Sequence, residues 1–135
     1  MSLQTTLHTA DVNGKPVRFF RSPQQGPDFP WHVADDLFLA LGFPRPVRKE
    51  FQRKLKADHA DQVRTVATSD GIVTIAPHYM AQGAIGAGID IGCTPPTAES
   101  SYAVAGLAGL KLILAERGLS GEAALRFTLD AARRA

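Results

Sequence analysis

The sequence predicts an α+β domain in which two short antiparallel hairpins pack with several helices, ending in a C-terminal helical hairpin. Three observations lead to this fold class. The 135 residues fit one domain, and 44% of them are hydrophobic against 21% charged, as in ordinary globular proteins. Two turn signals lie between runs of strand-forming residues. Elsewhere, apolar residues recur every three or four positions, the spacing that is typical of helices.

The first hairpin is expected around Asn13-Gly14, because both residues tolerate the positive φ angles of a two-residue turn. Residues 5–12 alternate weakly and predict an edge strand. Residues 16–21 predict the returning strand, with Val17 and Phe19 on one face and Arg18 and Phe20 on the other. Residues 22–30 contain three prolines and one glycine, which predicts a loop.

Two helices and a second hairpin are expected next. After a short extended piece at residues 31–33, residues 34–41 predict a helix that Gly42 ends. A second helix is expected over residues 47–59, with Val47, Phe51 and Leu55 as its buried stripe. Strands at residues 63–67 and 71–76 form the second hairpin, around Ser69-Asp70-Gly71.

Pro77 is expected to open a short helix at its first position, whereas the glycine-rich and alanine-rich residues 78–91 allow no firm prediction. A helix is expected from Thr94-Pro95-Pro96 to Arg117, followed by a last helix over residues 121–134. We divide the chain into residues 1–92 and a C-terminal helical hairpin, residues 93–135, within one compact unit. This hairpin is expected to cover the core or to form a homodimer interface.

The compartment is expected to be the cytoplasm. The single cysteine, Cys93, excludes an internal disulfide, and residues 1–10 lack the features of a secretory signal. The most apolar stretch, residues 102–115, is interrupted by Lys111 and is too short to cross a bilayer. It therefore predicts a buried helix.

Basic residues concentrate in one short segment. The net charge of the chain is +2, yet residues 45–64 alone carry seven basic and three acidic residues. At about 100° per residue, the side of the helix over residues 47–59 that faces away from its apolar stripe carries four cations and Gln52. Such a face suits a phosphate backbone, because each cation that neutralises a phosphate releases counterions. The residues that we expect to contact DNA are Arg45, Arg48, Lys49, Gln52, Arg53, Lys56 and Arg64.

Two other interpretations of the basic helix stay open. The face can be an ordinary solvated surface, although such surfaces usually mix charge signs to gain pairs four residues apart. It can also bind an acidic surface of a partner protein. In that case the domain is a protein-interaction module without DNA contact.

Residues 30–43 read Pro-Trp-His-Val-Ala-Asp-Asp-Leu-Phe-Leu-Ala-Leu-Gly-Phe. This stretch resembles the signature of the Bro-N family, the N-terminal domain of phage and viral Bro proteins. That signature is Pro-Trp, an aromatic residue, Val-Ala and an aspartate, followed by a helix that ends in Ala-Leu-Gly and an aromatic residue. Here His32 stands where the aromatic residue is usual, and the strand ahead of the motif contains Val17-Arg18-Phe19. The matching residues are Pro30, Trp31, Val33, Ala34, Asp36, Leu37, Ala40, Leu41, Gly42 and Phe43.

The resemblance covers about residues 12–90, including a polar or basic helix, a hairpin and a short helix in the family's order. It implies an α+β domain that binds DNA, or a repressor protein, in transcription regulation of the prophage antirepressor type.

No catalytic residue, metal ligand or cofactor is expected. His32 with Asp35 and Asp36 suggests a metal site only superficially, because a site needs three or four converging ligands and no fourth is evident. The glycines of residues 83–88 have the wrong order for a phosphate-binding loop. An enzyme would require a deep pocket that holds His32, Asp36 and His78 together.

Overall fold

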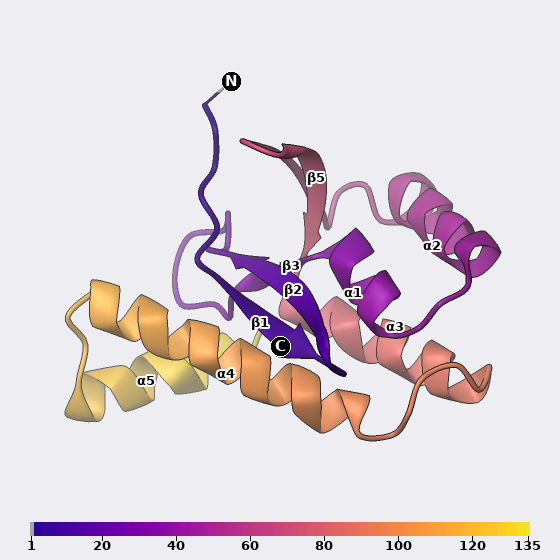
Figure 1. The fold of residues 1–135 in the computed structure, drawn as a ribbon. Coiled ribbons are helices and arrows are strands. Elements are labelled where there is room, and N and C mark those ends of the chain that lie inside the picture. Colours follow the sequence, from indigo (N-terminus) through magenta and orange to yellow (C-terminus); the bar gives the residue numbers. More distant parts are fainter. Residues whose placement is uncertain (1) are drawn as a thin grey trace.

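The computed structural model describes residues 2–135, which form one five-stranded antiparallel sheet and five helices (Figure 1). The α+β fold class is confirmed. The sheet has the order β1-β2-β3-β5-β4. Its strands are β1 (His8–Val12), β2 (Lys15–Phe20), β3 (Trp31–Val33), β4 (Arg64–Thr68) and β5 (Gly71–Ala76). The helices are α1 (Ala34–Ala40), α2 (Arg45–Asp58), α3 (His78–Asp90), α4 (Ala98–Glu116) and α5 (Gly121–Ala132).

Both predicted hairpins form. Asn13 has φ 53° and Gly14 has φ 80°, so both central residues of the β1–β2 turn adopt the positive φ angles of a type I′ turn. This turn sets Val12 opposite Lys15. β1 lies at the edge of the sheet as predicted, but it starts at His8 rather than at residue 5.

The central strand β3 joins the two hairpins, and all three of its residues are buried. Trp31 and Val33 point to one face, where they pack with Phe20 and Ile75. His32 points to the other face, beside Phe19 and Ala76 of the neighbouring strands. The sheet therefore buries side chains on both faces at its centre.

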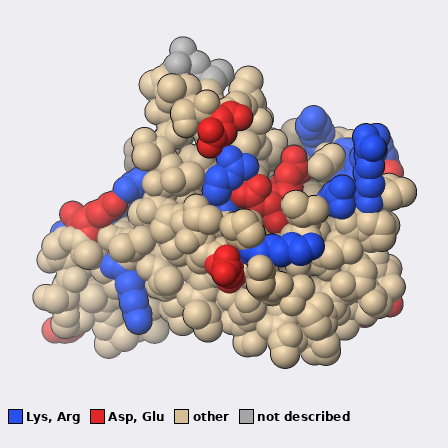
Figure 2. Space-filling model, viewed as in Figure 1, with Lys and Arg blue, Asp and Glu red and all other residues tan. Residues whose placement is uncertain are grey.

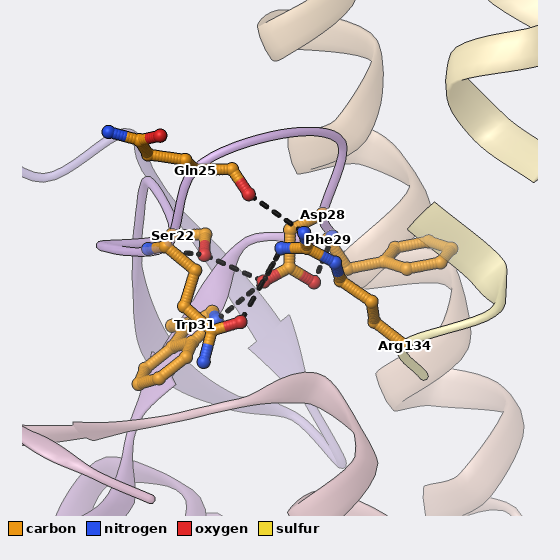
Figure 3. Close-up of polar contacts among 7 residues, drawn as sticks. Ser22, Gln25, Asp28, Phe29, Trp31 and Arg134 are labelled. Carbon is orange, nitrogen blue, oxygen red and sulfur yellow. Dashed lines mark hydrogen bonds and ion pairs between the residues drawn. The ribbon is translucent and has the colours of Figure 1, made fainter. Parts of the chain in front are cut away.

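A buried aspartate organises the loop between β2 and β3 (Figure 3). Asp28 is 6% exposed, and its carboxylate accepts hydrogen bonds from the Ser22 hydroxyl (2.6 Å) and from Nε1 of Trp31 (3.1 Å). Arg134, just beyond the end of α5, lies 3.9 Å from the same carboxylate and donates to the backbone oxygen of Gln25 (2.8 Å). These contacts satisfy a buried charge and attach the last turn of the chain to the loop.

The helix boundaries follow most of the sequence signals. α1 ends where Gly42 adopts φ 80°, with the backbone N–H of Phe43 bonded to the carbonyl oxygen of Phe38 (3.2 Å). Three expectations need correction. α2 begins at Arg45, two residues before the predicted start. Pro77 precedes α3 instead of being its first residue, and α3 continues to Asp90 despite three glycines. α4 begins at Ala98, because Pro95 and Pro96 lie in the turn ahead of it.

α4 is part of the main core. Tyr102 and Ala105 pack in the same cluster as β1, β2 and α1. Close approach depends on two glycines: a Cβ at Gly106 would lie 3.0 Å from His78, and one at Gly109 would lie 2.7 Å from Pro30. α4 therefore shares the main core with the preceding residues, whereas α5 packs with α4 and Phe29 in a second cluster.

Only one side of α4 is buried, although the sequence predicts a buried helix. Within residues 2–135, α4 is the one helix that has the length and apolar composition of a membrane span, with a mean hydropathy of 1.2. Its inner side packs on the sheet, which is the behaviour of a core helix. Its outer side exposes Val104 (68%) and Leu107 (47%).

Three histidines lie beneath α4. His32 is 2% exposed, and its Nδ1 is 2.8 Å from the hydroxyl oxygen of Tyr102. His78 stacks on Phe29, and His8 stacks on Phe19. Burial lowers the pKa of all three rings and lowers that of His32 to about 3, with a further contribution from the neighbouring His78. His32 is therefore neutral near pH 7.

Stability should fall in acid because of His32. Below about pH 6.5 the unfolded chain protonates this ring, whereas the folded protein holds it neutral down to about pH 3. The neutral His32 ring therefore contributes fully to the free energy of unfolding above pH 6.5. This contribution is lost toward pH 3, at up to about 1.4 kcal/mol per pH unit. Urea unfolding from pH 8 to pH 4 measures the slope of the free energy of unfolding against pH. This slope should be smaller in His32→Gln than in the wild type and unchanged in His59→Gln. Equal slopes in the wild-type and His32→Gln proteins would contradict the assignment.

Glycines in α3 and α4 should respond oppositely to alanine. Gly109→Ala places a Cβ 2.8 Å from Nε2 of His8 and 2.7 Å from Pro30, which should cost about 1–3 kcal/mol. Gly86→Ala meets no atom within 4 Å and removes a flexible residue from a helix, so it should stabilise by about 0.5–1 kcal/mol. Chemical denaturation of the two variants measures both changes. A loss of stability in Gly86→Ala, or none in Gly109→Ala, would refute this account of the packing.

Candidate nucleic-acid interface

α2 lies on the outside of the domain, well apart from α4 and α5 (Figure 1). It extends over Arg45–Asp58, and none of its residues is fully buried. Phe51 attaches it to the body, with its ring centroid 4.8 Å from that of Phe43 and 5.5 Å from that of Phe38. Val47 and Leu55 pack against the same core, so the apolar stripe faces the body as predicted, but its three residues are only partly buried.

Two members of the predicted DNA-contacting set bind residues outside α2. Arg48 donates from its guanidinium to the backbone oxygen of Phe43 (2.7 Å), just before the helix starts. Gln52 donates its side-chain amide to Asp35 of α1 (2.8 Å). These bonds hold α2 against the first turn of α1 and against the segment that follows α1.

Four other cations share the side of α2 that faces away from the core. At about 100° per residue they fall within an arc of about 80°, opposite the stripe that contains Phe51. We call this group the basic ridge; it consists of Arg45, Lys49, Arg53 and Lys56, all exposed. In the space-filling view one group of blue side chains lies at the upper right, over α2, and others are spread over the centre and left of this face (Figure 2).

The ridge is only lightly neutralised. Arg53 pairs with Glu50 one turn earlier, and both side chains are at least half exposed. Such a pair is weak in water and exchanges readily for a phosphate. Among residues 2–135, no ion pair involves Arg45, Lys49 or Lys56.

Arg64 is not placed with the ridge. Its neighbour in β4, Thr65, lines a groove of about 230 Å³ together with Lys56. Because successive strand residues point to opposite faces, the side chain of Arg64 points away from that groove. Of the seven predicted contact residues, the structure therefore brings four together on one exposed surface.

Sequence reasoning missed a cavity behind α2. Its volume is about 310 Å³, and Lys54 and His59 lie in its lining together with residues of α3. Lys54 is basic like its neighbours, but its angular position sets it on the flank of the helix, toward α3. Nothing in the residue pattern signals the cavity, because α3 approaches α2 only in the folded chain.

The groups considered for catalysis or metal binding do not converge. Asp36 forms a two-point ion pair with Arg18 (2.8 and 3.1 Å), and Asp35 accepts the hydrogen bond from Gln52. His32 and His78 lie together beneath α4, where both contact Tyr102. Among residues 2–135 there is no group of three histidine, cysteine, aspartate or glutamate side chains that would hold a metal ion.

Comparisons with protein-family models, with curated proteins and with solved structures give no match to this chain. The similarity of residues 12–90 to the Bro-N family stays a prediction from the motif.

Proposed function

We propose that the chain is a DNA-binding regulatory domain of the prophage antirepressor type, acting in the cytoplasm, and that α2 contacts the DNA. The observation that carries the proposal is the basic ridge: four exposed cations on the outer side of a helix whose opposite side is packed on the core. The predicted similarity to the Bro-N family agrees with it.

The dimensions of α2 fit a DNA groove. Fourteen residues make a helix about 21 Å long. The major groove is about 12 Å wide and admits one α-helix. Because α2 is attached along a single stripe, its outer side can approach the duplex without disturbing the core.

The contacts proposed for the ridge are mainly with phosphates. Lysine and arginine neutralise backbone charge, which positions a protein on DNA but carries no sequence information by itself. Gln52, the side chain best suited to recognise adenine, already bonds Asp35. We therefore expect strongly salt-dependent binding with modest sequence preference from α2 alone.

Reversing two ridge charges should remove most of the binding. Four neutralised phosphates give a slope of about −3 to −4 for log affinity against log salt concentration. The double variant Lys49→Glu/Lys56→Glu should halve that slope and weaken binding by at least about tenfold at low salt. Fluorescence anisotropy with a mixed-sequence duplex across a salt series measures both quantities. Arg48 is left unchanged, because it bonds the backbone of Phe43.

The matched control is Lys15→Glu/Lys111→Glu, which alters net charge equally at exposed positions outside α2. This control should keep the wild-type slope of log affinity against log salt concentration, and its affinity for the duplex should be within about twofold of the wild-type value. Equal losses in the two double variants would show that net charge, rather than the ridge, governs binding. Absence of binding at low salt would overturn the proposal and favour the alternative, a protein-interaction module that binds a repressor or another acidic partner through α2.

The proposed domain acts as a homodimer through α5. Leu125 (59% exposed) and Leu129 (54% exposed) form an apolar strip on its outer side, flanked by Glu122 and Arg133. In an antiparallel pair of α5 helices with the two-fold axis at residue 127, Leu125 of one copy faces Leu129 of the other. The surface is thus complementary to itself in apolar character, as a two-fold interface requires.

Analytical ultracentrifugation tests this pairing. The wild-type chain should sediment as a dimer at micromolar concentration, whereas Leu125→Glu/Leu129→Glu should be monomeric because four carboxylates would be buried in the interface. Val104→Glu on the outer side of α4 is the control and should leave the dimer intact. A monomeric wild-type chain, or a dimer that only Val104→Glu disrupts, would refute the α5 interface.

A further inference from the structure

The cavity behind α2 has apolar walls. Phe51 and Leu55 line it from α2, Phe38 lines it from α1, and Met80 lines it from α3. Phe51 and Leu55 remain only partly buried, although they are the residues that attach α2 to the core. An apolar body bound in this space would bury the surfaces that these side chains leave uncovered.

The polar side chains at the C-terminal end of α2 make this cavity suitable for an anion. Lys54, His59 and Gln62 are part of its lining, and no aspartate or glutamate is. Nδ1 of His59 donates to Oε1 of Gln62 (3.2 Å), so the Gln62 amide nitrogen stays available as a donor. Lys54 has no ion-pair partner among residues 2–135. A carboxylate would supply the missing counter-charge.

His32 contributes an unpaired donor. The ring is 2% exposed and lines the cavity, and the Tyr102 hydroxyl lies 2.8 Å from its Nδ1. Because that hydroxyl has no other acceptor among the described residues, it donates to Nδ1 and leaves the ring proton on Nε2. Nε2 of His32 has no hydrogen-bond partner. Two other unpaired histidine nitrogens, in His8 and His78, are completely shielded from solvent, but Nε2 of His32 is not. It therefore retains access to the cavity.

A glycine leaves the α3 side of the cavity open. Gly83 lines the cavity, and a Cβ at this position would meet no atom within 4 Å. This differs from Gly88, where a Cβ would lie 2.0 Å from Thr94. Close packing therefore explains why residue 88 is a glycine, but it does not explain why residue 83 is one. A larger side chain at residue 83 would project into open space beside the cavity.

We propose that this cavity binds a small carboxylate with an apolar body, its head group at Lys54, His59 and Gln62 and its body between α2 and α3. A liquid water molecule occupies about 30 Å³, so 310 Å³ has room for about ten non-hydrogen atoms. Medium-chain fatty acids and small aromatic acids have this size. The site is independent of DNA binding, because it depends only on the cavity and its lining.

Octanoate titrated into the full chain tests the site. Nuclear magnetic resonance should show saturable shifts of the His32 ring and of α2 and α3 amides, with a dissociation constant on the order of a millimolar or tighter. Gly83→Leu, which adds a large side chain to the lining of the cavity, should weaken binding at least about tenfold. Gly86→Leu is the matched control: it is the same substitution in the same helix, has equally open space, and lies outside the lining.

The charge of the ligand gives a second test. Octanoate should bind more tightly than octanol, and octylammonium should bind least, because Lys54 repels it. In Lys54→Met the advantage of octanoate over octanol should shrink at least about fivefold, while octanol binds as before. The proposal is overturned if octanoate gives no saturable shifts, if Gly83→Leu binds like Gly86→Leu, or if octylammonium binds as tightly as octanoate.

Discussion

The contact between His32 and Tyr102 joins the sheet to α4, and the arrangement of the core depends on it. Two polar groups are buried together, so each satisfies a hydrogen bond that water would otherwise make. The approach that allows this bond requires glycines at positions 106 and 109 of α4, because side chains there would meet His78, His8 and Pro30. The sheet and α4 thus share one core, with histidines at their boundary.

Local signals in the sequence predicted more than long-range ones did. Asn13-Gly14 and Gly42 identified a hairpin turn and a helix end, because the required backbone angles suit few residue types. The length of α3 was missed, since its glycines weaken helix propensity while tertiary packing supplies the stability. In the candidate site, periodicity identified the exposed side of α2. It did not show that Arg48 and Gln52 bind the body, because their partners lie on other segments.

α2 carries two surfaces with different chemistry. Its outer side is the basic ridge, and its inner flank forms a wall of the apolar cavity. Few contacts fix the helix: packing by Val47, Phe51 and Leu55, one guanidinium bond to a backbone oxygen, and one amide bond to Asp35. Phe51 and Leu55 of its apolar stripe line the cavity and are only partly buried. A helix held this lightly can respond to whatever fills the space behind it.

The three-residue strand β3 has a consequence for the order of folding. Each hairpin pairs residues close in sequence, so each can form within microseconds. Joining the hairpins requires β3 to pair with β5, which sets His32 beside Ala76 and closes a loop that contains α1, α2 and β4. Contacts of such high contact order slow folding. The complete sheet, and with it the burial of His32, is therefore expected to appear late, after the hairpins.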